Sequence, residues 1–173
     1  MRNCILIFLL AITSNFVQSQ STLPPVDSNT HRLTYQGVVE LSLKKDVLYD
    51  KGLNWAAIAF KNSNDVIQIK DKENGKIVGK YLLQPYEPKF GLVSATITLL
   101  FKDNKYKYII SDLNYQGSGV FSPWSLEDDP KPGKVGMTKW GQQKVKENTY
   151  IQIERLITDL KKYMNSNSQQ ADF

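Results

Sequence analysis

Hydrophobic and polar residues alternate along this chain with two different periods, which divide it into expected strands and helices. A period of two indicates strands with one buried face, and a spacing of three and four residues indicates helices. The helical spacing covers residues 42–61, where Ser42 can cap the first turn, and residues 139–164. Five strands are expected, within residues 33–41, 65–83 (two strands), 91–101 and 106–115.

Turn signals predict that consecutive strands pair as hairpins. Asn74-Gly75 suits the positive φ angles of a tight two-residue turn, and residues 102–105 separate the second pair of strands. Hairpins make neighbouring strands antiparallel, so both helices can cover the same face of one sheet. We therefore predict an α+β fold in the order β-α-β-β-β-β-α. It has a five-stranded antiparallel sheet, two helices on one face and an open opposite face.

The N-terminus has the pattern of a secretory signal peptide. Arg2 precedes the apolar run CILIFLLAI at 4–12. Nine residues of helix reach about 14 Å, whereas a bilayer core is about 30 Å thick, so no transmembrane segment is expected. A buried N-terminal helix or strand is the alternative. We expect signal-peptide cleavage after Ser19 and a periplasmic or extracellular protein.

The rest of the chain has room for one domain. Residues 20–31 are expected to form an extended leader, 32–164 a single α+β domain and 165–173 a disordered tail. The 173 residues, 41% of them hydrophobic, suit one globular core.

Composition leaves few routes to catalysis. One cysteine, Cys4, and one histidine, His31, provide neither a disulfide framework nor a Cys/His metal site. With so few bases the usual catalytic triads are not expected either. The stretch Gly117-Ser118-Gly119 lacks the spacing of a nucleophile elbow and does not open a helix. No cofactor and no metal are predicted.

Carboxylates give the one enzymatic alternative. Glu127, Asp128 and Asp129 lie together in a long loop and could gather a calcium ion. With a distant acid such as Asp112, they could instead act as a glycosidase-like hydrolase. Pro130 and the lysines that follow favour a solvated turn.

The formal net charge is +5, and the basic excess lies in residues 131–164. Lysines on the wet side of a helix usually serve solubility. These lysines are scattered, without interleaved aromatic residues, so a nucleic-acid partner is not expected.

Two groups of residues are candidates for binding. The open sheet face is expected to present Gln36, Lys80, Thr96 and Thr98, with Lys107 and Ser111 beside them. Such a face could bind a protein or glycan of the cell envelope or a second copy of the chain, or it could simply be hydrated. In and after the long 116–138 connection, three aromatic residues either contact a ligand or plug the core: Phe121, Trp124 and Trp140.

A family pattern runs through residues 33–115, in TYQGVVEL, LYDKGLNWAAIAF and DVIQIKDKENGKIVGK. The positions that carry it are Tyr35, Gly37, Leu48, Tyr49, Trp55, Ile69, Asp71, Gly75, Ile77 and Gly79. In these the chain resembles a secreted bacterial family, a domain of unknown function with a TATA-binding-protein-like fold. The resemblance implies the fold and an exported location. It implies no activity and no catalytic position, and the likeness to a DNA-binding protein concerns shape alone.

The sequence therefore predicts an exported, non-enzymatic binding or assembly module. Its working surface is expected to be the open sheet face, with the 116–140 loop at the rim.

Overall fold

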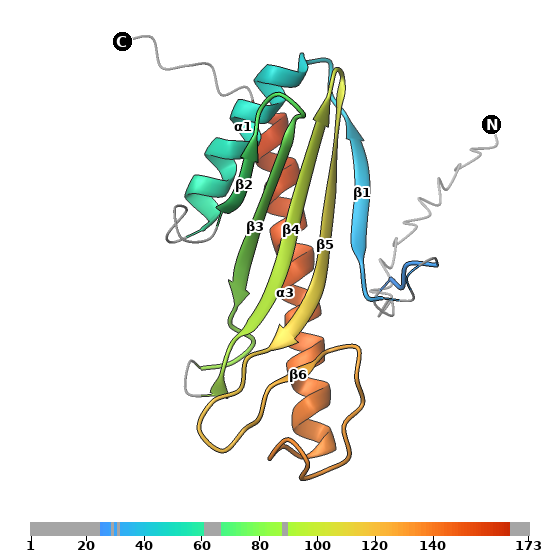
Figure 1. Ribbon diagram of the computed structural model, residues 1–173, viewed down its shortest axis with the longest axis vertical. Helices are drawn as coiled ribbons and strands as arrows, with labels where there is room; N and C mark the ends of the chain where they lie inside the picture. The colour runs from blue at the N-terminus through green and yellow to red at the C-terminus, as the bar shows by residue number, and fades with distance from the viewer. Residues whose placement is uncertain (1–24, 29, 31, 61–66, 88–89, 167–173) are drawn as a thin grey trace, which may run out of the picture.

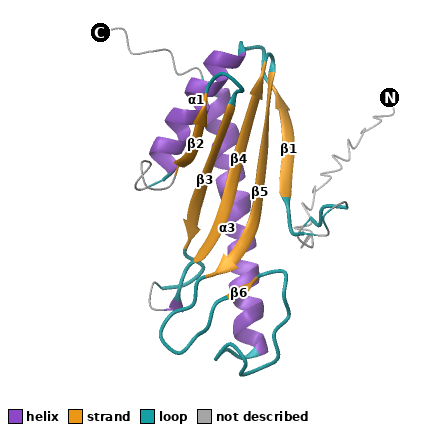
Figure 2. Ribbon diagram, in the orientation of Figure 1, coloured by secondary structure: helices purple, strands orange, loops and turns teal. Residues whose placement is uncertain are grey.

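The computed structural model describes residues 25–28, 30, 32–60, 67–87 and 90–166 (Figures 1 and 2). The expected signal peptide, most of the leader and nearly all of the tail lie outside the described residues. Within the described part, no helix combines the length and the apolar character needed to cross a membrane.

A single antiparallel sheet forms the body of the structure, and both helices cover one of its faces (Figure 1). The strand order is β1-β5-β4-β3-β2, and a short sixth strand pairs with β5. This confirms the predicted fold and adds β6, which the sequence pattern did not indicate. The elements are β1 (Tyr35–Glu40), α1 (Lys45–Ala59), β2 (Ile67–Asp71), β3 (Lys76–Leu83), β4 (Val93–Lys102), β5 (Lys105–Tyr115), β6 (Trp124–Ser125) and α3 (Lys139–Asn165).

The central strand β4 shows why one face of the sheet is covered. Its alternate apolar side chains from Val93 to Phe101 are buried, while Ser94, Thr96 and Thr98 on the other face are partly exposed. Helix α1 comes so close to β4 that a Cβ on Gly52 would lie 2.3 Å from Cζ of Phe101. The glycine therefore sets the depth at which the helix rests on the sheet.

Strand β5 contains a bulge that the alternation in the sequence leaves undefined. Thr96 pairs with Ser111 but Ser94 pairs with Asn114, so β5 has one more residue than β4 in this interval. Asp112 adopts φ 54° there. The extra residue changes the phase of the strand, which is why both Ile110 and Leu113 are buried although they are three residues apart.

Two local expectations need correction. The N-cap of α1 is Lys44, not Ser42, and its side chain makes no cap hydrogen bond. Instead Asp103, in the β4–β5 turn, accepts a hydrogen bond from the Lys45 backbone N–H at 2.8 Å. The β2–β3 turn is also longer than two residues and spans 72–75, with a positive φ at Gly75.

Asp71 is the reason for that longer turn. Its carboxylate accepts hydrogen bonds from the backbone N–H and from Nδ2 of Asn74, at 2.9 and 2.8 Å. A local side-chain bond of this kind stabilises a wider turn than the Asn-Gly pair alone would form.

Candidate functional site

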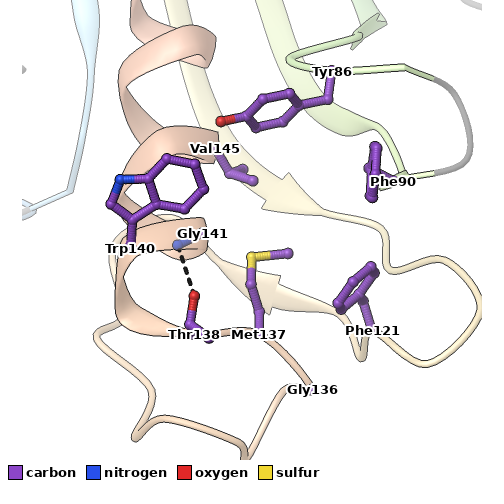
Figure 3. A pocket seen from close by; sticks show the side chains of 9 residues that line it. All are labelled: Tyr86, Phe90, Phe121, Gly136, Met137, Thr138, Trp140, Gly141 and Val145. Atoms are coloured by element: carbon purple, nitrogen blue, oxygen red, sulfur yellow. Dashed lines mark hydrogen bonds between the residues drawn. The ribbon is translucent and has the colours of Figure 1, made fainter.

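An apolar pocket lies where the loop after β5, the β3–β4 connection and the start of α3 come together (Figure 3). Its volume is about 310 Å³. Ligand pockets typically measure about 300–1,000 Å³, so this one has room for a single ring or a short alkyl group. The lining residues are Tyr86, Phe90, Phe121, Gly136, Met137, Thr138, Trp140, Gly141 and Val145.

Three aromatic rings form one wall of the pocket. The ring centroids of Tyr86 and Phe90 are 6.2 Å apart, and those of Phe90 and Phe121 are 6.4 Å apart. Hydrogen bonds hold the segment that carries the first two rings. The Tyr115 hydroxyl donates to the carbonyl of Phe90, and Nδ2 of Asn148 on α3 donates to the carbonyl of Pro85 at 3.1 Å.

A glycine closes the floor of the pocket by letting two arms of the loop touch. Gly136 has φ 73°, and a Cβ on it would lie 2.3 Å from the Val120 carbonyl oxygen. Close by, the Ser122 backbone N–H donates to the Val135 carbonyl at 3.1 Å. A side chain at position 136 would be strained and would meet backbone, so the closed loop requires glycine there.

The first turn of α3 provides the remaining wall. The hydroxyl oxygen of Thr138 accepts a hydrogen bond from the Gly141 backbone N–H at 3.1 Å and caps the helix (Figure 3). Trp140 stands at the mouth of the pocket with 71% of its surface exposed. The lining includes no carboxylate, amine or imidazole, so the pocket can bury an apolar group but does not hold a general acid or base of these types.

The structure divides the predicted loop residues between pocket and core. Phe121 and Trp140 line the pocket, as a binding role would require. Trp124 is only 7% exposed, and its ring centroid lies 5.9 Å from that of Tyr115. Nζ of Lys146 covers the indole at 5.6 Å. Of the two alternatives for Trp124, a ligand contact or a plug of the core, its burial supports the plug at the end of the core.

The predicted open-face residues lie away from the helices, as expected. Gln36 and Lys80 are exposed, and Thr96 and Thr98 are half-buried. They do not line the pocket, so the two groups of predicted residues belong to two separate surfaces.

Sequence reasoning missed three of the pocket's main side chains: Tyr86, Phe90 and Met137. A usable signal existed for the first two. Tyr86 and Phe90 lie in a connection between Pro85 and Gly91, the same setting that singled out Phe121. Met137 gives no comparable signal, because only the folded loop turns it inward.

Three of the four candidate carboxylates are each held by a different group. Glu127 accepts a hydrogen bond from the Leu33 backbone N–H at 3.1 Å, and Asp112 pairs with Arg32 at 3.4 Å. Asp129 pairs with the Lys139 ammonium, which lowers the pKa of that carboxyl.

A hydrolase needs a general acid with a raised pKa, and the shift at Asp129 has the opposite direction. Within the described residues no three metal-ligating side chains gather into a site. The geometry therefore gives the hydrolase alternative no support.

A second hollow, between α1, β3 and α3, contains more polar groups, but the fold uses them internally. Asp159 accepts a hydrogen bond from the Trp55 indole N–H at 3.1 Å. The Gln152 side chain makes two hydrogen bonds to the backbone of Gln84. These bonds tie α3 to α1 and β3, so we assign this hollow a structural role.

Comparisons with known proteins agree with the architecture. Residues 35–116 match the model of DUF4468, a domain of unknown function with TBP-like fold. No curated protein sequence matches the chain significantly. The crystal structure of a TBP-like protein from Parabacteroides distasonis superposes with a TM-score of 0.64 at 16% identity, covering 82% of this chain and 97% of that one. A DUF4468 family protein from Bacteroides ovatus gives a TM-score of 0.62 at 15% identity and coverages of 84% and 93%. Residues 35–116 of this chain thus match the DUF4468 family model, and the chain has a TBP-like fold.

Proposed function

We propose that this protein is an exported, non-enzymatic binding module and that its pocket takes up an apolar group of the ligand. The observation that carries the proposal is the exposure of large apolar side chains around that pocket. Trp140 and Phe90 line it and are 71% and 39% exposed, and Val120, in the same loop, is 81% exposed. Clustered apolar exposure of this kind typically marks an interaction site.

The lining also favours one class of ligand over another. A glycan presents hydroxyl groups that need polar partners, whereas this pocket offers mainly aromatic, methionine and valine side chains. We therefore favour an aromatic or aliphatic side chain of a partner protein, or a small hydrophobic molecule, over a glycan of the cell envelope. Export rests on the apolar run after Arg2, and mass spectrometry of the secreted protein tests it through the expected start at Gln20.

Binding of the amphiphilic fluorescent probe 8-anilinonaphthalene-1-sulfonate, whose single phenyl ring the pocket has room for, tests the pocket. We expect Trp140→Ala and Phe121→Ala each to weaken probe binding by about tenfold, because each removes a ring that would cover the probe. Val120→Ser is the matched control, since Val120 is exposed in the same loop but does not line the pocket. The proposal fails if the three variants bind the probe equally well, or if the native protein does not bind it.

A further inference from the structure

The sheet face opposite the helices faces the viewer in Figure 1. It has an apolar centre that runs across the strands. Strand register places side chains of this face in rows. Two adjacent rows carry most of the aliphatic groups. The first row is Gln36, Ile109, Thr98, Val78 and Ile69, and the second is Val38, Lys107, Leu100 and Lys76.

Several of these aliphatic side chains are open to water. Val38 is 59% exposed and Ile69 is 43% exposed, while Val78, Leu100 and Ile109 between them are half-buried. Strands lie about 4.8 Å apart, so the strip from β2 to β5 is about 14 Å long. A strip of this length could cover one face of a short peptide segment.

Lysines surround the strip. The open face carries Lys76, Lys80, Lys102, Lys105 and Lys107, and a hollow whose lining includes Val38 and Leu100 is bordered by the last three of them. No ion pair within the described residues joins any of the five to a carboxylate.

Four acids lie on or beside this face. Glu40 is opposite Lys105 and Asp71 is opposite Lys76. Asp27 accepts a hydrogen bond from Nε2 of Gln36 at 3.4 Å, and Asp112 pairs with Arg32. The Asp71 carboxylate is already hydrogen-bonded to Asn74. The face is therefore positively charged, and the partner that complements it is anionic.

The placement of the aromatic side chains narrows the class of partner. Every tyrosine and phenylalanine of the described strands belongs to the helix side by register. Tyr106 also lines the hollow beside Val38 and Leu100, but it is only 1% exposed and offers no ring surface for stacking. Single-stranded nucleic acids are bound by stacking on aromatic rings, and membrane interfaces are enriched in tryptophan and tyrosine. A second copy of the same face would bring lysines against lysines. The combination of aliphatic strip and lysines instead fits an acidic protein segment.

We propose that the open sheet face docks an acidic amphipathic helix of a partner protein, lying across the strands. Its apolar side would cover Ile109, Val78 and Ile69. Its carboxylates would pair with Lys80 on one side of the strip and with Lys76 and Lys107 on the other. Lys76 and Lys80 are four residues apart on β3, which corresponds to about 14 Å along the strand. A helix with its side chains is about 10–12 Å wide, so it fits between the two groups of lysines. The proposal rests on the proposed binding function but uses a surface separate from the pocket.

A designed helical peptide of leucine and glutamate, labelled for fluorescence anisotropy, tests the proposal on the purified protein. We expect it to bind, and we expect the same peptide with lysine in place of glutamate not to bind. The double variant K76E/K107E should lose about tenfold in affinity or more, because two attractions become repulsions. The control K131E/K134E changes the net charge equally, in an exposed part of the 116–138 loop, and should stay within about twofold of the native protein.

Other variants separate this surface from the pocket. Ile69→Ser should weaken binding of the acidic peptide, because Ile69 belongs to the row that the helix would cover. Trp140→Ala should leave the affinity for the peptide unchanged, although it removes a wall of the pocket. Circular dichroism of each variant confirms that the fold is intact.

Four results would overturn the proposal. The first is no binding of the acidic peptide, and the second is equal loss in the two charge-reversal variants. The third is binding to phosphatidylglycerol vesicles in place of the peptide. The fourth is a dimer, seen by light scattering, that K76E/K107E dissociates, because that result would assign the face to a second copy.

Discussion

Closure of the pocket depends on one glycine, and a pair of alanine substitutions can isolate its contribution. Gly136 and Gly133 lie in the same turn of the loop with similar backbone angles, φ 73° and 81°. A Cβ on Gly133 would meet nothing within 4 Å, whereas a Cβ on Gly136 would lie 2.3 Å from the Val120 carbonyl oxygen. The two substitutions therefore share the backbone strain and differ in the steric contact.

Each substitution should lower the free energy of unfolding by an amount that general values for backbone strain and overpacking give. Placing alanine in the left-handed region costs about 1–2 kcal/mol, which both variants should lose from the free energy of unfolding. Gly136→Ala should lose a further 1–3 kcal/mol, approximately, because the methyl group must push two backbone segments apart. A domain of this size is typically stable by about 5–15 kcal/mol, so both variants should still fold.

Urea unfolding at equilibrium measures both changes, and probe binding reports on the pocket. We expect Gly136→Ala to unfold at a lower urea concentration than Gly133→Ala and to bind the fluorescent probe more weakly. If the two variants have the same stability and the same probe affinity, contact between the loop arms does not shape the pocket.

Three further predictions concern the core. Gly52→Ala should destabilise the protein by about 1–2 kcal/mol despite alanine's higher helix propensity, because its methyl group would overlap the Phe101 ring; urea unfolding should show partial rescue by Phe101→Leu. Trp124→Ala should cost about 3–5 kcal/mol in unfolding experiments, and Trp140→Ala no more than about 0.5 kcal/mol; similar costs would contradict the assignment of one to the core and the other to the surface. Burial raises the pKa of Tyr106 to about 12. Because the unfolded state loses that proton first, near pH 10, the contribution of Tyr106 to stability should be constant below pH 10 and fall as the pH rises toward 12. Tyr106→Phe should lessen this fall in urea unfolding curves recorded between pH 9 and 12, approximately, and an unchanged slope would argue against the buried hydroxyl as its source.

The sequence was sufficient for the fold because its signals are local and repeated. The strict alternation from Val93 to Leu99 has only one arrangement that buries the apolar side, so it determines both the strand and its covered face. The spacing in residues 139–164 likewise predicted α3 to within one residue of its observed end. The same alternation also predicted that the polar residues Ser94, Thr96 and Thr98 lie on the opposite face of β4.

Features that depend on contacts between distant parts of the chain could not be predicted from the hydrophobic pattern. The α1 N-terminus is capped by Asp103, which is 58 residues away in the chain from the N–H it binds. The β5 bulge inserts one residue opposite β4, and alternation within a single strand cannot show what its neighbour does. The helix cap and the bulge each depend on a residue elsewhere in the chain, so neither produces a periodic pattern in the local sequence.

The candidate site shows the same division. From the sequence alone came an open sheet face with Gln36, Lys80, Thr96 and Thr98, and a long loop rich in glycine and aromatic residues. Only the tertiary structure decided that Trp124 fills the core while Trp140 stands at a pocket. Trp124 lies in the aperiodic loop and Trp140 in the first turn of α3 next to it, so the burial of both depends on how the loop folds back. Periodicity specifies which side of a regular element is buried, and irregular segments have no period to specify it.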